Sequence, residues 1–121
     1  MLMRQDAKSL DLGRAIYHKL HTSANGHDLL KEARDWAVRF SQQRPEDIWL
    51  AEWVERLNAA LSSEKGRNDL YDLLLSPEQH AIDMRSSSPF SHVLTTKERT
   101  TVLLAFEAQW RKGTWHDGRA A

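Results

Sequence analysis

The sequence contains no cysteine, which removes several kinds of chemistry at once. Disulfide bridges, thiolate zinc sites and cysteine nucleophiles are all excluded. A chain of 121 residues does not need such staples, because it is long enough to bury a sizeable core. Together with frequent arginine and tryptophan, the missing cysteine suggests a bacterial protein from a reducing compartment.

Glycine and proline are also scarce, with five and three residues. Neither the glycine-rich P-loop nor the dinucleotide fingerprint occurs. The serine run at 86–88 lacks the glycines of a nucleophile elbow, and the His116-Asp117 pair has neither a nucleophile nor a rigid pocket beside it. We therefore expect a protein that is not an enzyme and that carries no cofactor.

Long apolar runs are absent as well. No stretch approaches the roughly 18 consecutive apolar residues of a membrane-spanning helix. The first ten residues, MLMRQDAKSL, lack the apolar core of a secretory signal. We expect a soluble cytoplasmic protein without a membrane partner.

Neither sign of charge is in excess, since 17 basic and 17 acidic side chains give a formal net charge of zero. Domains that bind duplex DNA usually show a basic excess. The stretch at 27–43, which follows the SANG turn, has the layout of a recognition helix. Its acidic and basic residues nearly cancel, however, and phosphate binding needs a positive field. Nucleic-acid binding through this helix therefore stands as an alternative that the charge balance disfavours.

Apolar side chains recur at helical spacing along most of the chain. The pattern predicts helices at 8–22, 27–43, 45–61, 69–75, from residue 77 onward, and at 96–112. Strand signals are poor, because β-branched clusters and hairpin turns are missing. We therefore predict an all-α fold, an irregular bundle of five to six short helices. It forms a single domain over 1–121, with flexible ends at 1–6 and 113–121.

Local signals place the helix boundaries. Thr95 to Glu98 and Ser76 to Gln79 match the capping-box pattern, and Gly113 should end the last helix. Asn25-Gly26 is expected to take the left-handed conformation, and Pro45 to begin a helix. The stretch SSEKGRND at 62–69 reads as a loop, and Phe90 and Val93 should drop from another loop onto the core.

Five tryptophans are many for a small domain. Trp36, Trp53 and Trp110 lie on the main apolar stripes and are predicted to be core. Trp49 lies at the edge of its stripe, and Trp115 follows Gly113 beyond the last helix. Indoles in such positions either pack partially against their own fold or anchor a partner.

These marginal rings favour a small helical regulatory or adaptor protein that binds another protein. An inhibitor or antiactivator of a transcription regulator or an enzyme is one form of this hypothesis, by analogy of class alone. The candidate contact residues are the aromatic side chains Trp49, Trp115 and Tyr17 and the nearby Arg56 and Arg111. Apolar residues at 1–3, with Ile16 and Tyr17, would suit a homodimer.

Histidines suggest a second alternative, a metal-binding protein. His18 and His21 share a helix face, and His27 follows the next turn. The HExxH pattern of helical zinc enzymes is absent, and two histidines three residues apart are common on exposed helices. We therefore expect no metal site.

Overall fold

The computed structural model describes residues 2–118, and six helices account for most of them. No strand occurs in that range, which confirms the predicted all-α class. The helices are α1 (Arg4–Thr22), α2 (Gly26–Gln43), α3 (Ile48–Ser62), α4 (Glu64–Leu75), α5 (Gln79–Ser86) and α6 (Thr96–Lys112). Within residues 2–118 no helix is long and apolar enough to cross a membrane.

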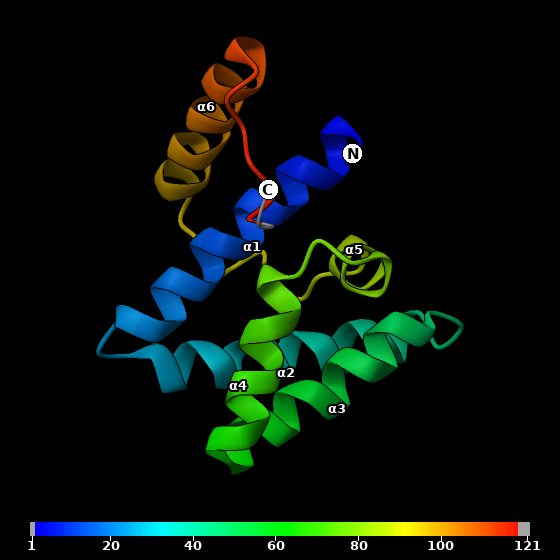
Figure 1. The fold of residues 1–121 in the computed structure, drawn as a ribbon. Coiled ribbons are helices and arrows are strands. Elements are labelled where there is room, and N and C mark those ends of the chain that lie inside the picture. Colours follow the sequence, from blue (N-terminus) through cyan, green and yellow to red (C-terminus); the bar gives the residue numbers. More distant parts are fainter. Residues whose placement is uncertain (1, 119–121) are drawn as a thin grey trace.

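The helices α1 to α5 pack together as a body, and α6 lies beside it as an arm (Figure 1). In the body, α2 packs along α3, and α4 packs against α3 and α1. The helix α1 contacts α2, α4, α5 and α6, whereas α6 contacts no helix except α1. The arm therefore depends on a single helix for its position.

Trp53 lies at the centre of the body and has no exposed surface. Its indole Nε1 donates to the Met84 carbonyl oxygen at 2.6 Å, and its ring meets the Phe90 ring edge-on with centroids 5.2 Å apart. One side chain of α3 thus fixes α5 and the following loop. Phe90 and Val93 are buried in the same core, as predicted.

The predicted loop at 62–69 is wrong, because α4 begins at Glu64 with a single residue between it and α3. Ser63 caps the new helix by accepting the Gly66 amide at 3.0 Å. Gly66 lies so close to α3 that a Cβ built on it would be 2.1 Å from the Ala59 carbonyl oxygen. The tight turn therefore requires glycine for space.

The predicted left-handed turn at Asn25-Gly26 is also wrong, since among residues 2–118 only Gly113 and Gly118 have positive φ. Gly26 instead allows α2 to start against the end of α1, where a Cβ would be 2.3 Å from the Leu20 carbonyl oxygen. Two later boundary predictions are confirmed. Thr95 and Glu98 form a reciprocal capping box, and Gly113 ends α6 with φ 70°.

Two other boundaries differ from the predictions. The helix α3 begins at Ile48 with Asp47 as its cap, rather than at Pro45. The break after α4 lies at Ser76 as expected, but Gln79 does not complete a capping box. The Ser76 hydroxyl accepts the Glu78 amide instead, at 3.1 Å.

Salt bridges to α1 hold the arm near both ends. Arg4 pairs with Glu107, and Lys19 Nζ lies 2.7 Å from Glu98 Oε1, so α6 runs in the opposite direction to α1. Phe106 is the one fully buried residue of α6, whereas Leu104 on the outer face is 66% exposed.

Only one of the three tryptophans predicted to be core is fully buried. Trp53 is enclosed, but Trp36 and Trp110 are half-buried. Trp110 belongs to the arm, which has one helix as its neighbour, and Trp36 stacks on His92 with centroids 4.3 Å apart. An apolar stripe marks the inward face of a helix but does not reveal how much protein covers it.

The predicted flexible ends at 1–6 and 113–121 are partly helical or packed. Residues 4–6 belong to α1, and Trp115 packs back onto α1. Met1 and residues 119–121 lie outside the described residues.

Candidate protein-binding surface

An open groove runs over the exposed sides of α3 and α5, and we call it the α3–α5 surface. Its lining residues come from 48–56 of α3 and from the first turn of α5: Ile48, Ala51, Glu52, Glu55, Arg56 and His80. Ile48 is 67% exposed although it is a large aliphatic residue. The surface thus combines an exposed apolar side chain with several charged ones.

Asp47 sets where α3 begins and so positions Ile48 and Trp49. Its carboxylate accepts the amides of Trp49 at 3.0 Å and Leu50 at 3.3 Å, and Ser87 Oγ donates to it at 2.7 Å. Burial alone would raise the pKa of Asp47. The bonds from Ser87 and the two amides, with the charge of Arg44, outweigh burial and lower this pKa below 3.8.

Trp49 borders the α3–α5 surface and is half-buried. One side of the residue packs against the core, and its ring meets His80 edge-on with centroids 5.5 Å apart. The indole therefore supports the fold and also offers area to solvent. Amphipathic aromatic side chains in such positions are typical anchors of protein interfaces.

A small ionic network lies beside the two apolar residues. His80 Nε2 is 2.8 Å from Glu52 Oε2, and Arg56 Nη2 is 3.3 Å from the same oxygen. Glu55 is exposed and forms no ion pair with any residue of 2–118. An unpaired exposed carboxylate is free to meet a cation of a partner.

Charge is segregated along the chain even though the total is zero. Residues 45–84 contain nine acidic and three basic side chains, a net charge of −6. The segments 1–44 and 85–121 each carry a net charge of +3. The helices α3, α4 and most of α5 fall in the acidic segment, so the α3–α5 surface belongs to the acidic part of the chain.

The acidic surface continues onto α4. A neighbouring shallow groove is lined by Arg56, Asp69, Asp72, Leu73 and Ser76. Arg56 lines both grooves, and Asp72 is exposed. The combined surface is long enough to follow an extended or helical segment of another protein.

The structure separates the five predicted contact residues. Trp49 and Arg56 meet at the α3–α5 surface, whereas the other three lie elsewhere. Tyr17 packs between His21 and Tyr71, at 5.4 and 5.0 Å between ring centroids. Arg111 lies on α6, 4.0 Å from Glu107.

Trp115 folds back rather than projecting into solvent. Its Nε1 donates to Asp11 Oδ1 at 2.9 Å, and the Arg14 guanidinium lies 5.5 Å from its ring centroid. Its ring also contacts Phe106 and Trp110. Trp115 therefore helps to hold the arm on α1.

The structure exposes only part of the apolar patch that was expected to support a homodimer. Ile16 is buried in the core and Tyr17 is half-buried, whereas Met3 is 74% exposed. Leu2 lines a pocket with Trp110 and Trp115. The predicted patch is therefore not continuous.

The three histidines of the metal alternative do not form a site. His18, His21 and His27 are all exposed, and His21 stacks on Tyr17 instead of facing a ligand. Among residues 2–118, no three His, Cys, Asp or Glu side chains are placed to hold one metal ion. The three-histidine hypothesis is therefore wrong for this fold.

The helix of the nucleic-acid alternative, α2, presents aromatic rings with guanidinium groups over them. Arg39 lies 4.5 Å from the centroid of Trp36, and Arg44 lies 5.3 Å from that of Phe40. Trp36, Arg39 and Phe40 thus lie near one another on α2, with Arg44 just after its end, and the Trp36 ring also stacks on His92. Aromatic rings and cations are the groups with which proteins contact single-stranded bases.

His80 was missed by the sequence reasoning. It is 28 residues from Glu52, its hydrogen-bond partner, and only the packing of α5 on α3 joins them. Ile48 had a signal, because it stands beside Trp49 at the edge of the apolar stripe of α3. Nothing in the pattern distinguished that edge position from a buried one.

Comparison of the chain with protein-family models, curated proteins and solved structures finds no match in any of the three.

Proposed function

We propose that this chain is a small helical adaptor or regulatory protein that acts by binding another protein through the α3–α5 surface. An inhibitor or antiactivator that docks on a transcription regulator or an enzyme is one form of this function. The observation that carries the proposal is Ile48, 67% exposed beside the half-buried Trp49. Apolar area of this kind, rimmed by charge, is typical of a docking site.

The charges around Ile48 and Trp49 favour a partner segment of positive charge. Glu55 is unpaired, Asp72 is exposed, and the surrounding segment carries a net charge of −6. A partner segment with Lys or Arg flanking one or two apolar side chains complements this surface. Charge complementarity of this kind speeds association and selects among partners.

The test compares capture of proteins from the native host by the wild type and by surface variants. Ile48→Asp removes the apolar anchor, and Glu55→Lys reverses the unpaired charge. Glu32→Lys on α2 is the matched control, because Glu32 is exposed and lies outside the α3–α5 surface. Each variant is first shown by circular dichroism to melt like the wild type.

A protein bound by the wild type and by Glu32→Lys, and lost with Ile48→Asp and Glu55→Lys, supports the proposal. The captured protein is then purified, and its affinity is measured by calorimetry. A loss of at least about tenfold in affinity is expected for Ile48→Asp, since interface anchors contribute roughly 2 kcal/mol or more. Equal capture by all four proteins would place the binding site elsewhere.

The rings and guanidinium groups on α2 favour a second candidate, binding of single-stranded nucleic acid. Gel-shift titration with an oligonucleotide at two salt concentrations tests it. Binding that weakens with salt and is lost in Arg39→Gln would support this candidate. No shift at micromolar protein and low salt would eliminate it.

A further inference from the structure

A separate pocket of about 270 Å³ lies where α1, the end of α4, the α5–α6 loop and the start of α6 meet. Its apolar lining consists of Leu12, Gly13, Ile16, Leu74, Phe90 and Leu94. Pockets that take drug-sized ligands have roughly 300–1,000 Å³, so this one suits a smaller molecule. None of its lining residues belongs to the α3–α5 surface.

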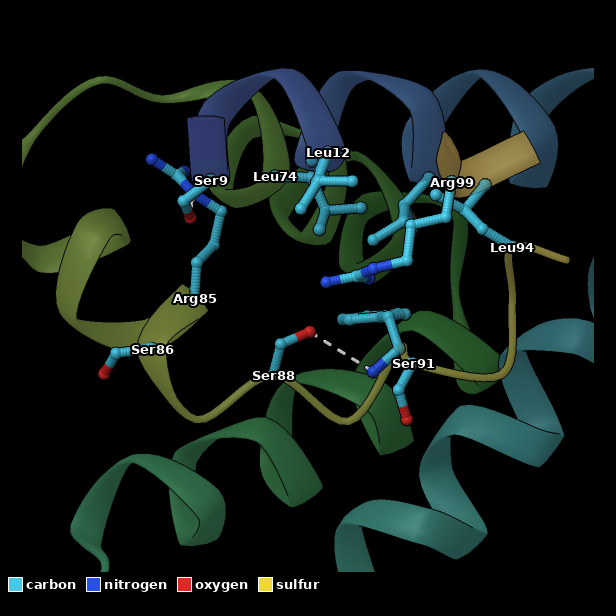
Figure 2. Close-up of a pocket in the computed structure, with 12 residues that line it drawn as sticks. Ser9, Leu12, Leu74, Arg85, Ser86, Ser88, Ser91, Leu94 and Arg99 are labelled. Carbon is cyan, nitrogen blue, oxygen red and sulfur yellow. Dashed lines mark hydrogen bonds between the residues drawn. The ribbon is translucent and has the colours of Figure 1, made fainter. Parts of the chain in front are cut away.

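The polar lining contains cations and hydroxyls but no carboxylate. It consists of Arg85, Arg99, Ser9, Ser86, Ser88 and Ser91. Figure 2 shows Arg99 reaching across the pocket from the start of α6, with its guanidinium between Leu12 and Ser88. The Arg99 side chain forms no ion pair or hydrogen bond with another residue of 2–118, and only its backbone amide is bonded, to the Thr95 carbonyl at 2.9 Å. Its guanidinium therefore presents free donors inside the pocket.

Arg85 places a second positive charge in the wall. It is 92% buried; its Nη1 donates to the Leu73 and Ser76 carbonyls at 3.0 and 2.7 Å, and its Nε donates to Ser9 Oγ at 3.1 Å. Its Nη2 is buried without a hydrogen-bond partner, and no carboxylate within 2–118 pairs with it. Burial lowers the pKa of Arg85 to about 10, which still leaves the group charged at neutral pH. Buried charges are usually paired, whereas Arg85 forms no salt bridge within 2–118, although the charge of Asp6 outside the pocket favours its charged form.

We propose that this pocket binds a small organic anion, a carboxylate with a short aliphatic or aromatic body. The carboxylate would accept two parallel N–H bonds from Arg99, a geometry that guanidinium groups favour. The Ser88 hydroxyl points toward the Arg99 guanidinium and accepts the Phe90 amide at 3.2 Å, whereas the Ser91 hydroxyl points away from the guanidinium (Figure 2). The apolar body would contact Leu12 and Phe90, and the ligand would neutralise part of the positive charge that Arg85 and Arg99 create.

The experiment titrates the full chain, labelled with ¹⁵N, with hexanoate up to about 20 mM at constant ionic strength. Hexanamide has a similar body without charge, and inorganic phosphate has charge without a body. We expect saturable shifts of the Ser88, Ser91 and Leu94 amides with hexanoate. Binding of the other two probes should be at least about tenfold weaker, a difference of about 1.4 kcal/mol.

One arginine variant and one lysine variant of α6 test whether Arg99 is the cation that binds the carboxylate. Arg99→Gln should weaken hexanoate binding at least about tenfold. Lys97→Gln, which removes the same charge from an exposed site outside the pocket, should leave it unchanged. Both side chains are exposed, so both variants are expected to melt like the wild type.

Three results would overturn the proposal. The first is no saturable shift with hexanoate at about 20 mM, which is far above the dissociation constant of even a weak site. The second is equal affinity of Arg99→Gln and the wild type for hexanoate. The third is phosphate binding as tightly as hexanoate, which would reduce the pocket to a site for simple anions.

Discussion

Replacing Trp53 by phenylalanine is expected to lower the free energy of unfolding by about 2–3 kcal/mol. The variant loses the hydrogen bond from the indole Nε1 to the Met84 carbonyl, which contributes about 1 kcal/mol. That carbonyl keeps one partner, because the Ser87 amide also donates to it at 3.1 Å. The larger penalty of an orphaned buried carbonyl is therefore avoided.

The smaller ring also leaves a void. Phenylalanine is smaller by about 40 Å³, and at about 24 cal/mol per Å³ of residual cavity the void costs about 1 kcal/mol. Part of the edge-on contact with Phe90 is lost as well, at a cost of about 0.5 kcal/mol. Trp53 has no exposed surface, so water cannot refill the space.

Trp49→Phe is the matched control on the same helix. Trp49 is half-buried, and its indole N–H donates to no residue of 2–118, so the cost should stay below about 1 kcal/mol. Urea unfolding followed by circular dichroism at 222 nm measures both changes. If Trp49→Phe proved as destabilising as Trp53→Phe, or if Trp53→Phe cost less than about 1 kcal/mol, the assignment of core and rim indoles would be refuted.

Three further predictions concern the turn, the cap and the arm. Gly66→Ala should destabilise the protein by about 1–3 kcal/mol in urea unfolding, because its Cβ would meet the Ala59 carbonyl; an unchanged midpoint would show that α4 shifts freely. The folded-state pKa of Asp47 is depressed, so its contribution is present above pH 3.8 and is lost as the pH falls through the lower, folded-state pKa. Asp47→Ala should therefore lose about 1 kcal/mol at pH 7 and show a flatter acid limb in unfolding experiments at pH 2–5, and an identical limb would argue against the lowered pKa. Trp115→Ala should speed amide hydrogen exchange in α6 but not in α2 or α3, since α6 contacts only α1; uniform acceleration would contradict an independent arm.

Helix order was predictable from the sequence because amphipathic spacing and capping residues are local signals. The capping box at Thr95 and the left-handed Gly113 need no knowledge of the rest of the chain, and both are confirmed. Gly66 is the opposite case. Its role depends on an α3 carbonyl seven residues away, so a glycine between polar residues read as a loop.

The candidate sites were harder to predict than the helices. Trp49 was identified from its edge position, but His80 lies on another helix, 28 residues beyond its partner Glu52. Arg85 and Arg99 likewise line one pocket only because α5 and the start of α6 both pack near α1. Side-chain chemistry was visible in each case, but the juxtaposition was a property of the packing.

The net charge of zero argued against nucleic-acid binding. That total, however, averages over segments of the chain that carry opposite net charges. The segment 45–84 holds a net charge of −6, and each flanking segment holds +3. At physiological ionic strength the Debye length is about 8 Å, so a ligand at one surface responds to the charges near it rather than to the total. On the two proposals above, the α3–α5 surface would attract a cationic segment and the Arg99 pocket an anion, although the molecule as a whole is neutral. This separation lets the two proposed ligands bind at different places without competing.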